Sequence, residues 1–276
     1  MIGEFARKSR VIVFFPPVAV QADPILFLGS ESQQTSLGIF TTNGASVTSQ
    51  TAVGTAGSPF NGVGEGAGLT GIVTRALSSG DFDTRTLTGN LISSFTHATP
   101  GYLNEDMAGN GIDLWSANSA SPTIYKLDPA NGNTLDTRTL TGVSQLVGMT
   151  FVGSQLWAGD FGAGTIGTID LTLNKYTPAF SAFSAQTLGG LAYDPLNSVL
   201  WVGSFSLLRP YSTGGTILGP DVDTSAIYPG FIDGSAFIEN APANEVPEPG
   251  TLLLMGTGVG TFLARRRARR APKQQL

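Results

Sequence analysis

The chain has 276 residues, of which 41% are hydrophobic, only 13% are charged, 36 are Gly, one is His and none is Cys. The lack of Cys excludes disulfide scaffolds, zinc fingers, iron–sulfur clusters and thiol nucleophiles, and the single His excludes histidine-rich metal sites. The formal net charge is −5, yet 19 of the 20 acidic and only six of the 15 basic residues lie between residues 23 and 264. Such an acidic body repels nucleic-acid phosphates, so we expect no nucleic-acid partner.

The N-terminus has the order of a secretory signal peptide. Basic residues between positions 7 and 10 precede an apolar run from 11 to 20, and Val20-Gln21-Ala22 offers the small residues that a signal peptidase reads. Two prolines interrupt the apolar run, and a buried first strand is the alternative interpretation. We expect residues 1–22 to be a cleaved signal peptide, with the mature chain beginning at Asp23.

The body of the chain is built of repeats. Its three tryptophans lie about 43 residues apart, each directly after a Leu and three positions before a polar residue. No sustained helical period of apolar residues occurs between residues 23 and 241. Around Trp157 the pattern predicts four strands joined by tight turns, at residues 148–152, 155–159, 165–170 and 172–180.

Four antiparallel strands repeated at this spacing are typical of propeller blades. The sequences Gly-Leu-Ala-Tyr-Asp-Pro at residues 190–195 and Leu-Trp-Val-Gly at residues 200–203 resemble strands of bacterial NHL-type and related β-propellers. We therefore expect an all-β fold over residues 23–241, a β-propeller of about five four-stranded blades, or six if the units are short. A β-sandwich and an irregular solenoid are the alternatives. An identical heptapeptide at residues 83–89 and 136–142 is interpreted as one repeat period plus an insertion.

The C-terminus combines three elements in order. A linker over residues 242–251 contains Val246-Pro247-Glu248-Pro249, an uncharged run follows at 252–264, and a basic cluster begins with Arg265-Arg266-Arg267. The uncharged run is shorter than the roughly 20 residues that span a membrane, and the arginines favour the cytoplasmic side. We therefore expect a marginal, transient anchor.

These three elements resemble the PEP-CTERM sorting signal of Gram-negative bacteria, with a hydrophobic helix and Arg-rich tail over residues 252–276. The resemblance implies transient insertion into the inner membrane and recognition by exosortase, a membrane transpeptidase-like enzyme. It also implies removal of the tail near the Pro-Glu-Pro sequence and release to the cell surface or extracellular matrix. An ordinary tail anchor is the alternative.

The sequence contains no clear catalytic or cofactor site. His97 is the one imidazole, and no nucleophile elbow accompanies it. Acidic and amide residues at 104–113 lack the spacing of a calcium loop, and the glycine-rich residues 62–68 lack the Lys and the helix of a phosphate loop. We expect no catalytic residue, no metal site and no cofactor.

Asn118, Asp160 and Ser204 occupy equivalent places at the ends of the three Trp-bearing strands. In a propeller such positions line one face around the central axis, where ligands commonly bind. The alternative is that each side chain caps the turn that follows it. We take these three residues as a candidate binding face.

These features predict an exported surface or extracellular-matrix protein with a non-catalytic binding propeller, associated with exopolysaccharide or with another surface protein. The alternative is a secreted propeller enzyme, such as a lactonase-like hydrolase or a polysaccharide lyase, with a carboxylate-bound metal. Calcium-dependent turnover of a lactone or glycan would favour the enzyme. Binding of a glycan without product would favour the binding propeller.

Overall fold

The computed structural model describes residues 25–30, 36–54, 60–65, 71–76, 81–96, 107–118, 120–227 and 230–238. These residues form strands and turns, and they contain no helix that is long and apolar enough to cross a membrane. The predicted signal peptide, the Pro-Glu-Pro linker, the predicted hydrophobic helix and its arginines lie outside the described residues.

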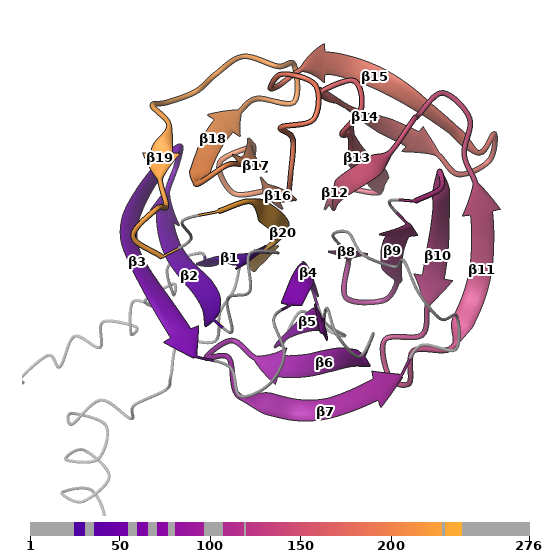
Figure 1. Ribbon diagram of the computed structural model, residues 1–276, viewed down its shortest axis with the longest axis horizontal. Helices are drawn as coiled ribbons and strands as arrows, with labels where there is room; N and C mark the ends of the chain where they lie inside the picture. Colours follow the sequence, from indigo (N-terminus) through magenta and orange to yellow (C-terminus); the bar gives the residue numbers. More distant parts are fainter. Residues whose placement is uncertain are drawn as a thin grey trace, which may run out of the picture.

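The described strands form five four-stranded antiparallel sheets around a common axis, which confirms the predicted five-bladed propeller (Figure 1). Each sheet is one blade, whose strands follow one another from the axis outward. Blade 1 contains β20 (Ile232–Ile238), β1 (Ile25–Ser30), β2 (Ser36–Asn43) and β3 (Ser46–Gly54). Blade 2 contains β4 (Phe60–Glu65), β5 (Gly71–Ala76), β6 (Asp81–Thr86) and β7 (Leu91–Thr96). Blade 3 contains β8 (Met107–Gly109), β9 (Leu114–Asn118), β10 (Thr123–Leu127) and β11 (Thr134–Thr139).

The last two blades follow the same order. Blade 4 contains β12 (Leu146–Val152), β13 (Gln155–Asp160), β14 (Thr165–Asp170) and β15 (Lys175–Ser181). Blade 5 contains β16 (Leu191–Asp194), β17 (Val199–Ser204), β18 (Leu207–Tyr211) and β19 (Val222–Asp223). The outer strand of blade 5 is therefore short, and Pro210 lies beyond the residues of β18 that pair with it. Proline has no N–H to donate, so it suits a position of β18 that has no ladder partner in β19.

Blade 4 shows how the sequence sets the strands. A two-residue turn joins β12 to β13, and Gly153 supplies its positive φ of 60°. The Asp170 side chain accepts hydrogen bonds from the backbone N–H groups of Thr172 and Leu173 at 2.8 and 3.0 Å. The four strands predicted for this unit are confirmed, but the outer strand begins at Lys175 because this capped turn precedes it.

The three tryptophans occupy equivalent places in their blades. Each lies in the second strand and is paired with a small residue of the inner strand: Trp115 with Ala108, Trp157 with Thr150, and Trp201 with Ala192. All three are at most 8% exposed, and each packs into the core between its own blade and the following blade. The large ring fills the space that the small inner residue leaves.

Blades 1 and 2 have other residues at the second-strand position that a tryptophan occupies in blades 3, 4 and 5. Phe27 of β1 is paired with Ala236 of β20, and Val73 of β5 is paired with Gly64 of β4. Both large residues are fully buried and pack against the following blade. All five blades therefore share one arrangement, in which a large residue of the second strand covers a small residue of the inner strand.

Glycines allow the inner strands to approach one another near the axis. A Cβ atom on Gly64 of β4 would lie 2.7 Å from the Cβ atom of Met107 on β8. A Cβ atom on Gly189, just before β16, would overlap the carbonyl oxygen of Ile232 on β20. Side chains at these two positions would push neighbouring blades apart.

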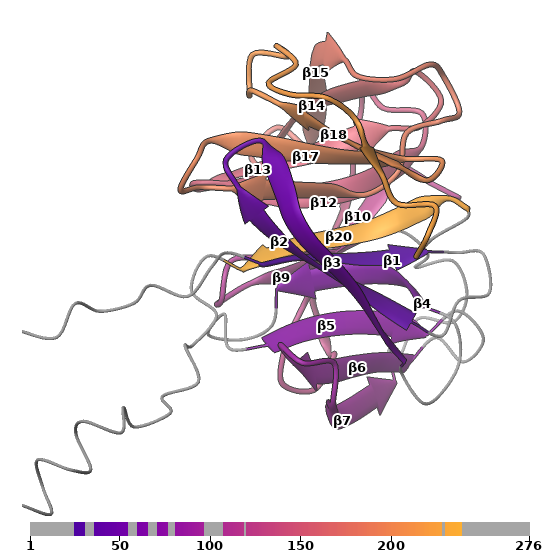
Figure 2. The same cartoon turned by 90° about the vertical axis from the view of Figure 1, so that its left-hand side faces the viewer.

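The last described strand closes the ring. β20 pairs antiparallel with β1, and the pairing runs from Ile25 opposite Ile238 to Ser30 opposite Ile232. Because β1 begins where β20 ends, both ends of the described chain leave the propeller on the same side (Figure 2). We call this side the terminal face and the opposite side the distal face.

The duplicated heptapeptide lies on strands that are not equivalent. Residues 83–89 begin in β6, the third strand of blade 2, whereas residues 136–142 begin in β11, the fourth strand of blade 3. The interpretation as one period plus an insertion is therefore wrong, because the offset is one blade plus one strand. In both copies the arginine pairs with the aspartate two residues before it, as residues on one side of a strand do: Arg85 with Asp83 and Arg138 with Asp136.

Candidate functional site

The distal face carries the turns between the second and third strands of each blade and the connections between blades. Its described segments are residues 120–122, 140–145, 161–164, 182–190, 205–206, 224–227 and 230–231. Loops at one end of a rigid scaffold are the usual carriers of binding residues. The candidate binding face predicted from the sequence lies on this side, because second strands end there.

Asp160 ends β13 and is only 5% exposed. Its Oδ1 atom accepts a hydrogen bond from the Ser144 hydroxyl at 2.6 Å and from the Gly162 N–H at 3.1 Å, while Oδ2 accepts from the Ser144 N–H at 3.1 Å. The carboxylate therefore ties the turn after β13 to the connection between blades 3 and 4.

The other two predicted residues are also engaged within the fold. The Asn118 Oδ1 atom accepts a hydrogen bond from the Ala120 N–H at 2.9 Å, and the Ser204 hydroxyl donates to the carbonyl oxygen of Thr187 at 2.6 Å. The three predicted residues thus lie on one face. The hydrogen bonds of Asn118 and Asp160 match the capping alternative, whereas Ser204 bonds the connection between blades 4 and 5 and not its own turn. Direct ligand contact by any of them stays a prediction.

Three phenylalanines meet beside these positions. Phe161 and Phe205 directly follow Asp160 and Ser204, and Phe231 directly precedes β20. The rings of Phe205 and Phe231 have centroids 4.8 Å apart at 80°, and those of Phe161 and Phe231 lie 6.0 Å apart at 72°. Both pairs have the favourable edge-to-face geometry. We call these three residues the distal aromatic cluster.

Backbone hydrogen bonds fix Phe161 between two connections. Its N–H donates to the carbonyl oxygen of Gln145 at 2.8 Å, and its carbonyl oxygen accepts from the N–H of Gln186 at 2.7 Å. Gln186 has a φ of 64°, in the left-handed region that non-glycine residues seldom adopt. The connections into blades 4 and 5 therefore hold this phenylalanine from both sides.

Phe205 and Phe231 are joined across blades 5 and 1. The two residues form an isolated antiparallel bridge, and the N–H of Ser206 donates to the carbonyl oxygen of Gly230 at 2.8 Å. Ser206 also has a left-handed φ of 49°. Ring contacts and backbone hydrogen bonds therefore both hold Phe205 and Phe231 in place.

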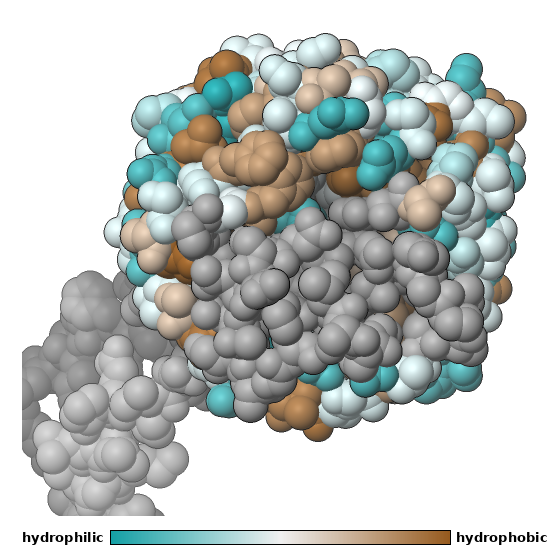
Figure 3. Space-filling model, viewed as in Figure 1, coloured by the Kyte–Doolittle hydropathy of each residue, from teal (hydrophilic) through white to brown (hydrophobic). Residues whose placement is uncertain are grey.

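The surface around the distal aromatic cluster is largely apolar, and the guanidinium of Arg209 on β18 lies 4.6 Å from the centroid of the Phe183 ring in the connection between blades 4 and 5. Phe205 is 55% exposed, and Phe161 and Phe231 are half-buried. Figure 3 looks onto the distal face and shows apolar surface gathered over β16 and β17 with hydrophilic residues around it. The described segments of this face contain no Lys or Arg. Exposed polar groups nearby are the side chains of Ser184 and Gln186.

The distal aromatic cluster is not among the site residues predicted from the sequence. Phe161 and Phe205 follow Trp157 and Trp201 at the same offset of four positions, so the aligned repeats do contain a signal for these two. Phe231 carries no such signal, because it follows no tryptophan repeat. Its partners come from turns that are distant in sequence.

The other candidates from the sequence form turns or lie outside the described residues. The Asn110 side chain accepts hydrogen bonds from the N–H groups of Ile112 and Asp113, and the Asp113 carboxylate pairs with Lys126 at 2.8 Å. His97 and the acidic residues at 105 and 106 are outside the described residues. Among the residues that the structure describes, no three His, Cys, Asp or Glu side chains gather as a metal site would require.

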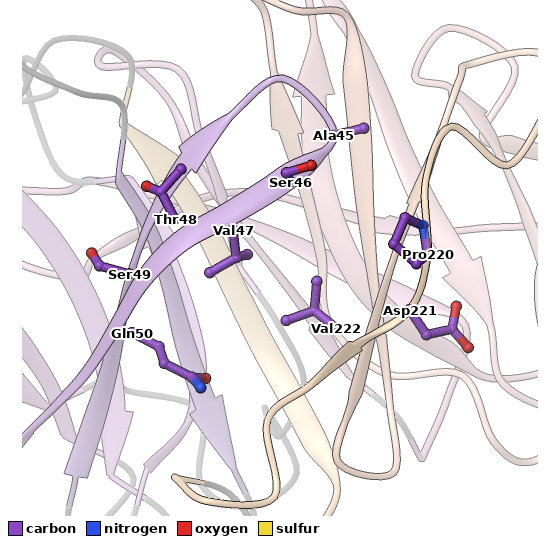
Figure 4. Close-up of a pocket in the computed structure, with 9 residues that line it drawn as sticks. All are labelled: Ala45, Ser46, Val47, Thr48, Ser49, Gln50, Pro220, Asp221 and Val222. Atoms are coloured by element: carbon purple, nitrogen blue, oxygen red, sulfur yellow. The ribbon is translucent and has the colours of Figure 1, made fainter.

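A shallow groove of about 400 Å³ lies between blades 1 and 5, lined by residues 45–50 and 220–222 (Figure 4). Val47 and Val222 face each other across it. On its blade 5 side, Arg209 forms a two-pronged ion pair with Asp221, at 2.6 and 2.7 Å. Hydrogen bonding to Arg209 lowers the pKa of Asp221 below the ordinary value.

Comparison with solved structures supports the propeller fold. A chain of the nidogen/laminin complex matches with a TM-score of 0.56 and 10% identity, over 78% of this chain and 98% of that chain. A protein of unknown function from Bacteroides caccae matches with a TM-score of 0.50 and 12% identity, over 79% of this chain and 99% of that one. A glutaminyl cyclase from Myxococcus xanthus matches with a TM-score of 0.50 and 14% identity, over 61% and 72%. Identities this low show the fold alone.

Sequence comparison identifies the C-terminus. No curated protein matches the chain, but residues 245–269 match the model of the PEP-CTERM protein-sorting motif. The match contains the predicted residues Val246–Pro249 and Arg265–Arg267. This motif implies export, transient membrane anchoring, processing by exosortase and a place at the cell surface. The protein is therefore an exported exosortase substrate that contains a five-bladed β-propeller followed by a PEP-CTERM sorting motif.

Proposed function

We propose that this protein is a non-catalytic binding propeller of the cell surface or extracellular matrix of a Gram-negative bacterium, and that it binds exopolysaccharide through its distal face. One observation carries the proposal. The distal aromatic cluster, of which Phe205 is exposed, lies on the face opposite to the one from which both chain ends leave. A propeller that is tethered or released through its terminal face presents this cluster to its surroundings.

The chemistry of the distal aromatic cluster suits a polysaccharide. The C–H groups on one side of a pyranose ring are weakly positive, and the face of an aromatic ring is negative, so the two attract each other. Three phenylalanines held by backbone contacts supply such faces at little cost in conformational entropy. A polymer also covers several neighbouring blades, which matches a cluster contributed by blades 4, 5 and 1.

The residues predicted from the sequence have a positioning role in this proposal. Asp160 and Ser204 fix the turns that carry Phe161 and Phe205, through hydrogen bonds to neighbouring connections. Asn118 fixes the equivalent turn of blade 3. Replacing Asp160 with Ala is expected to weaken binding indirectly, by loosening the turn that holds Phe161.

Co-sedimentation with the host exopolysaccharide tests the proposal. The processed protein is expected to sediment with the polymer, and the double variant Phe161→Ala/Phe205→Ala is expected to lose at least about tenfold in affinity, as aromatic anchors commonly do. Ile92→Ala, which truncates a 59% exposed side chain on outer strand β7, is the matched control and should bind normally. Equal binding by the double variant and the control would overturn the proposal.

A further inference from the structure

Building on this proposed function, we infer that the polymer bound at the distal face is an uncharged polysaccharide. Many extracellular polysaccharides carry carboxylate or sulfate groups, and proteins usually bind such groups through Arg or Lys. The described segments of the distal face contain neither residue. An anionic polymer would therefore lose hydration on binding without gaining a cationic partner.

The charges near this face oppose an anionic polymer. Asp223 ends the outer strand of blade 5, beside the connection that leads to Phe231, and is exposed. Its pKa is lowered by hydrogen bonds from Ser225, so it remains ionised at neutral pH. A second acidic residue, Asp160, directly precedes Phe161 in the chain. Like charges are also in excess over the whole body of the chain, which repels polyanions at long range.

The exposed groups that remain suit a neutral, hydroxylated ligand. Phe205 offers an apolar ring for stacking, and the exposed side chains of Ser184 and Gln186 offer hydroxyl and amide groups for hydrogen bonds. Ligand sites commonly combine apolar walls with a few polar groups of this kind. The described loops around this aromatic surface contain no Lys or Arg, and the neighbouring Arg209 is already paired with Asp221, so the surface selects against an anionic polymer.

Anion-exchange fractionation of the host exopolysaccharide tests this inference. The neutral and the acidic fractions are each cast into native gels, and the retardation of the processed protein is measured. Dextran and hydroxyethyl cellulose serve as neutral reference polymers, and alginate and polygalacturonate as anionic ones. The variants are Phe205→Ala, Phe205→Trp, which keeps an aromatic face, and Leu173→Ala, which changes a 67% exposed side chain on the terminal face.

We expect the neutral fraction to retard the protein at least about tenfold more strongly than the acidic fraction. This retardation should be lost in Phe205→Ala and retained in Phe205→Trp and Leu173→Ala, with unchanged thermal unfolding in all three. Retardation by the acidic fraction that depends on Phe205 would overturn the inference but leave the proposed function standing. If no fraction gives retardation that depends on Phe205, both the inference and the proposed function are wrong.

Discussion

Ile25 and Ile238 lie directly opposite each other in the sheet of blade 1, so the first and last described residues of the propeller are neighbours. This pairing closes the ring of blades and also determines which face of the propeller carries both chain ends. Both chain ends leave on the terminal face, while Phe161, Phe205 and Phe231 lie on the distal face. The predicted signal peptide and the sorting motif are therefore both connected to the propeller at its terminal face.

The anchored protein should hold its terminal face toward the membrane. Residues 239–251, between β20 and the uncharged run that is predicted to anchor the chain, span at most about 45 Å when extended. The chain has no Cys, so single cysteines report on each face. In a variant that retains the tail, Ser225→Cys on the distal face should react several-fold faster with a bulky maleimide than Leu196→Cys on the terminal face. Equal rates on intact cells would contradict this orientation, and equal rates after detergent extraction serve as the control.

The shared packing position predicts similar costs of truncation in different blades. Trp115→Ala, Trp157→Ala and Trp201→Ala should each lower the free energy of unfolding by about 3–5 kcal/mol, because each removes a buried ring between two blades. Phe27→Ala should fall in the same range, although blade 1 has no tryptophan. Urea unfolding of the processed protein measures these values. A loss below about 1 kcal/mol for Phe27→Ala would show that its position is not equivalent.

Part of this arrangement can be predicted from the sequence. The spacing of the tryptophans predicts the length of one blade and hence the approximate number of blades. The turn residues predict the strands of blade 4. Blades 1 and 2 are harder to recognise, because Phe27 and Val73 replace the tryptophan and only their pairing with Ala236 and Gly64 shows the equivalence. Repeated sequence alone also misleads, since the two identical heptapeptides adopt the third and the fourth strand positions.

Close approach of the inner strands predicts a sharp difference between two glycines. Gly64→Ala should destabilise the propeller by about 1–3 kcal/mol, because its Cβ atom would press against Met107. Gly214→Ala is the matched control, since the nearest atom to its Cβ would be the Ser212 hydroxyl at 3.7 Å. This control should be neutral or slightly stabilising. Chemical denaturation that finds the two variants equally stable would contradict the packing described at the axis.

The ion pair beside the groove predicts a small, pH-dependent contribution to stability. The pKa of Asp221 is lowered in the folded state, so the pair stabilises the fold above the unfolded-state pKa and this contribution is lost as the pH falls through the folded-state value. Because both side chains are partly exposed, Asp221→Asn should cost less than about 1 kcal/mol at pH 7. At about pH 3 the difference from the wild type should shrink. An equal loss at both pH values would show that the effect is not electrostatic.

The candidate site is predicted less completely than the fold, for physical reasons. The offset after each tryptophan identifies the turns of Asp160 and Ser204, but it does not distinguish a side chain that caps a turn from one that faces solvent. The distal aromatic cluster also needs Phe231, which reaches Phe205 only because β20 returns to blade 1. Ring closure of this kind joins residues that no local pattern connects.

The prolines and the arginines of the sorting motif are expected to have separate roles in its processing by exosortase. The prolines are expected to keep the region around Glu248 extended and outside the following hydrophobic segment, and the arginines are expected to favour the cytoplasmic side. Replacing Pro247, Glu248 and Pro249 with alanines should leave export intact but block release, giving a membrane-retained species. Removing residues 265–270 should instead weaken retention before processing.

Intact-mass analysis of protein extracted from the surface of an exosortase-positive host tests the central claim, processing at the sorting motif, most directly. We predict a chain that begins near Asp23 and has lost residues 252–276. A mass that still includes the arginine tail would contradict the account.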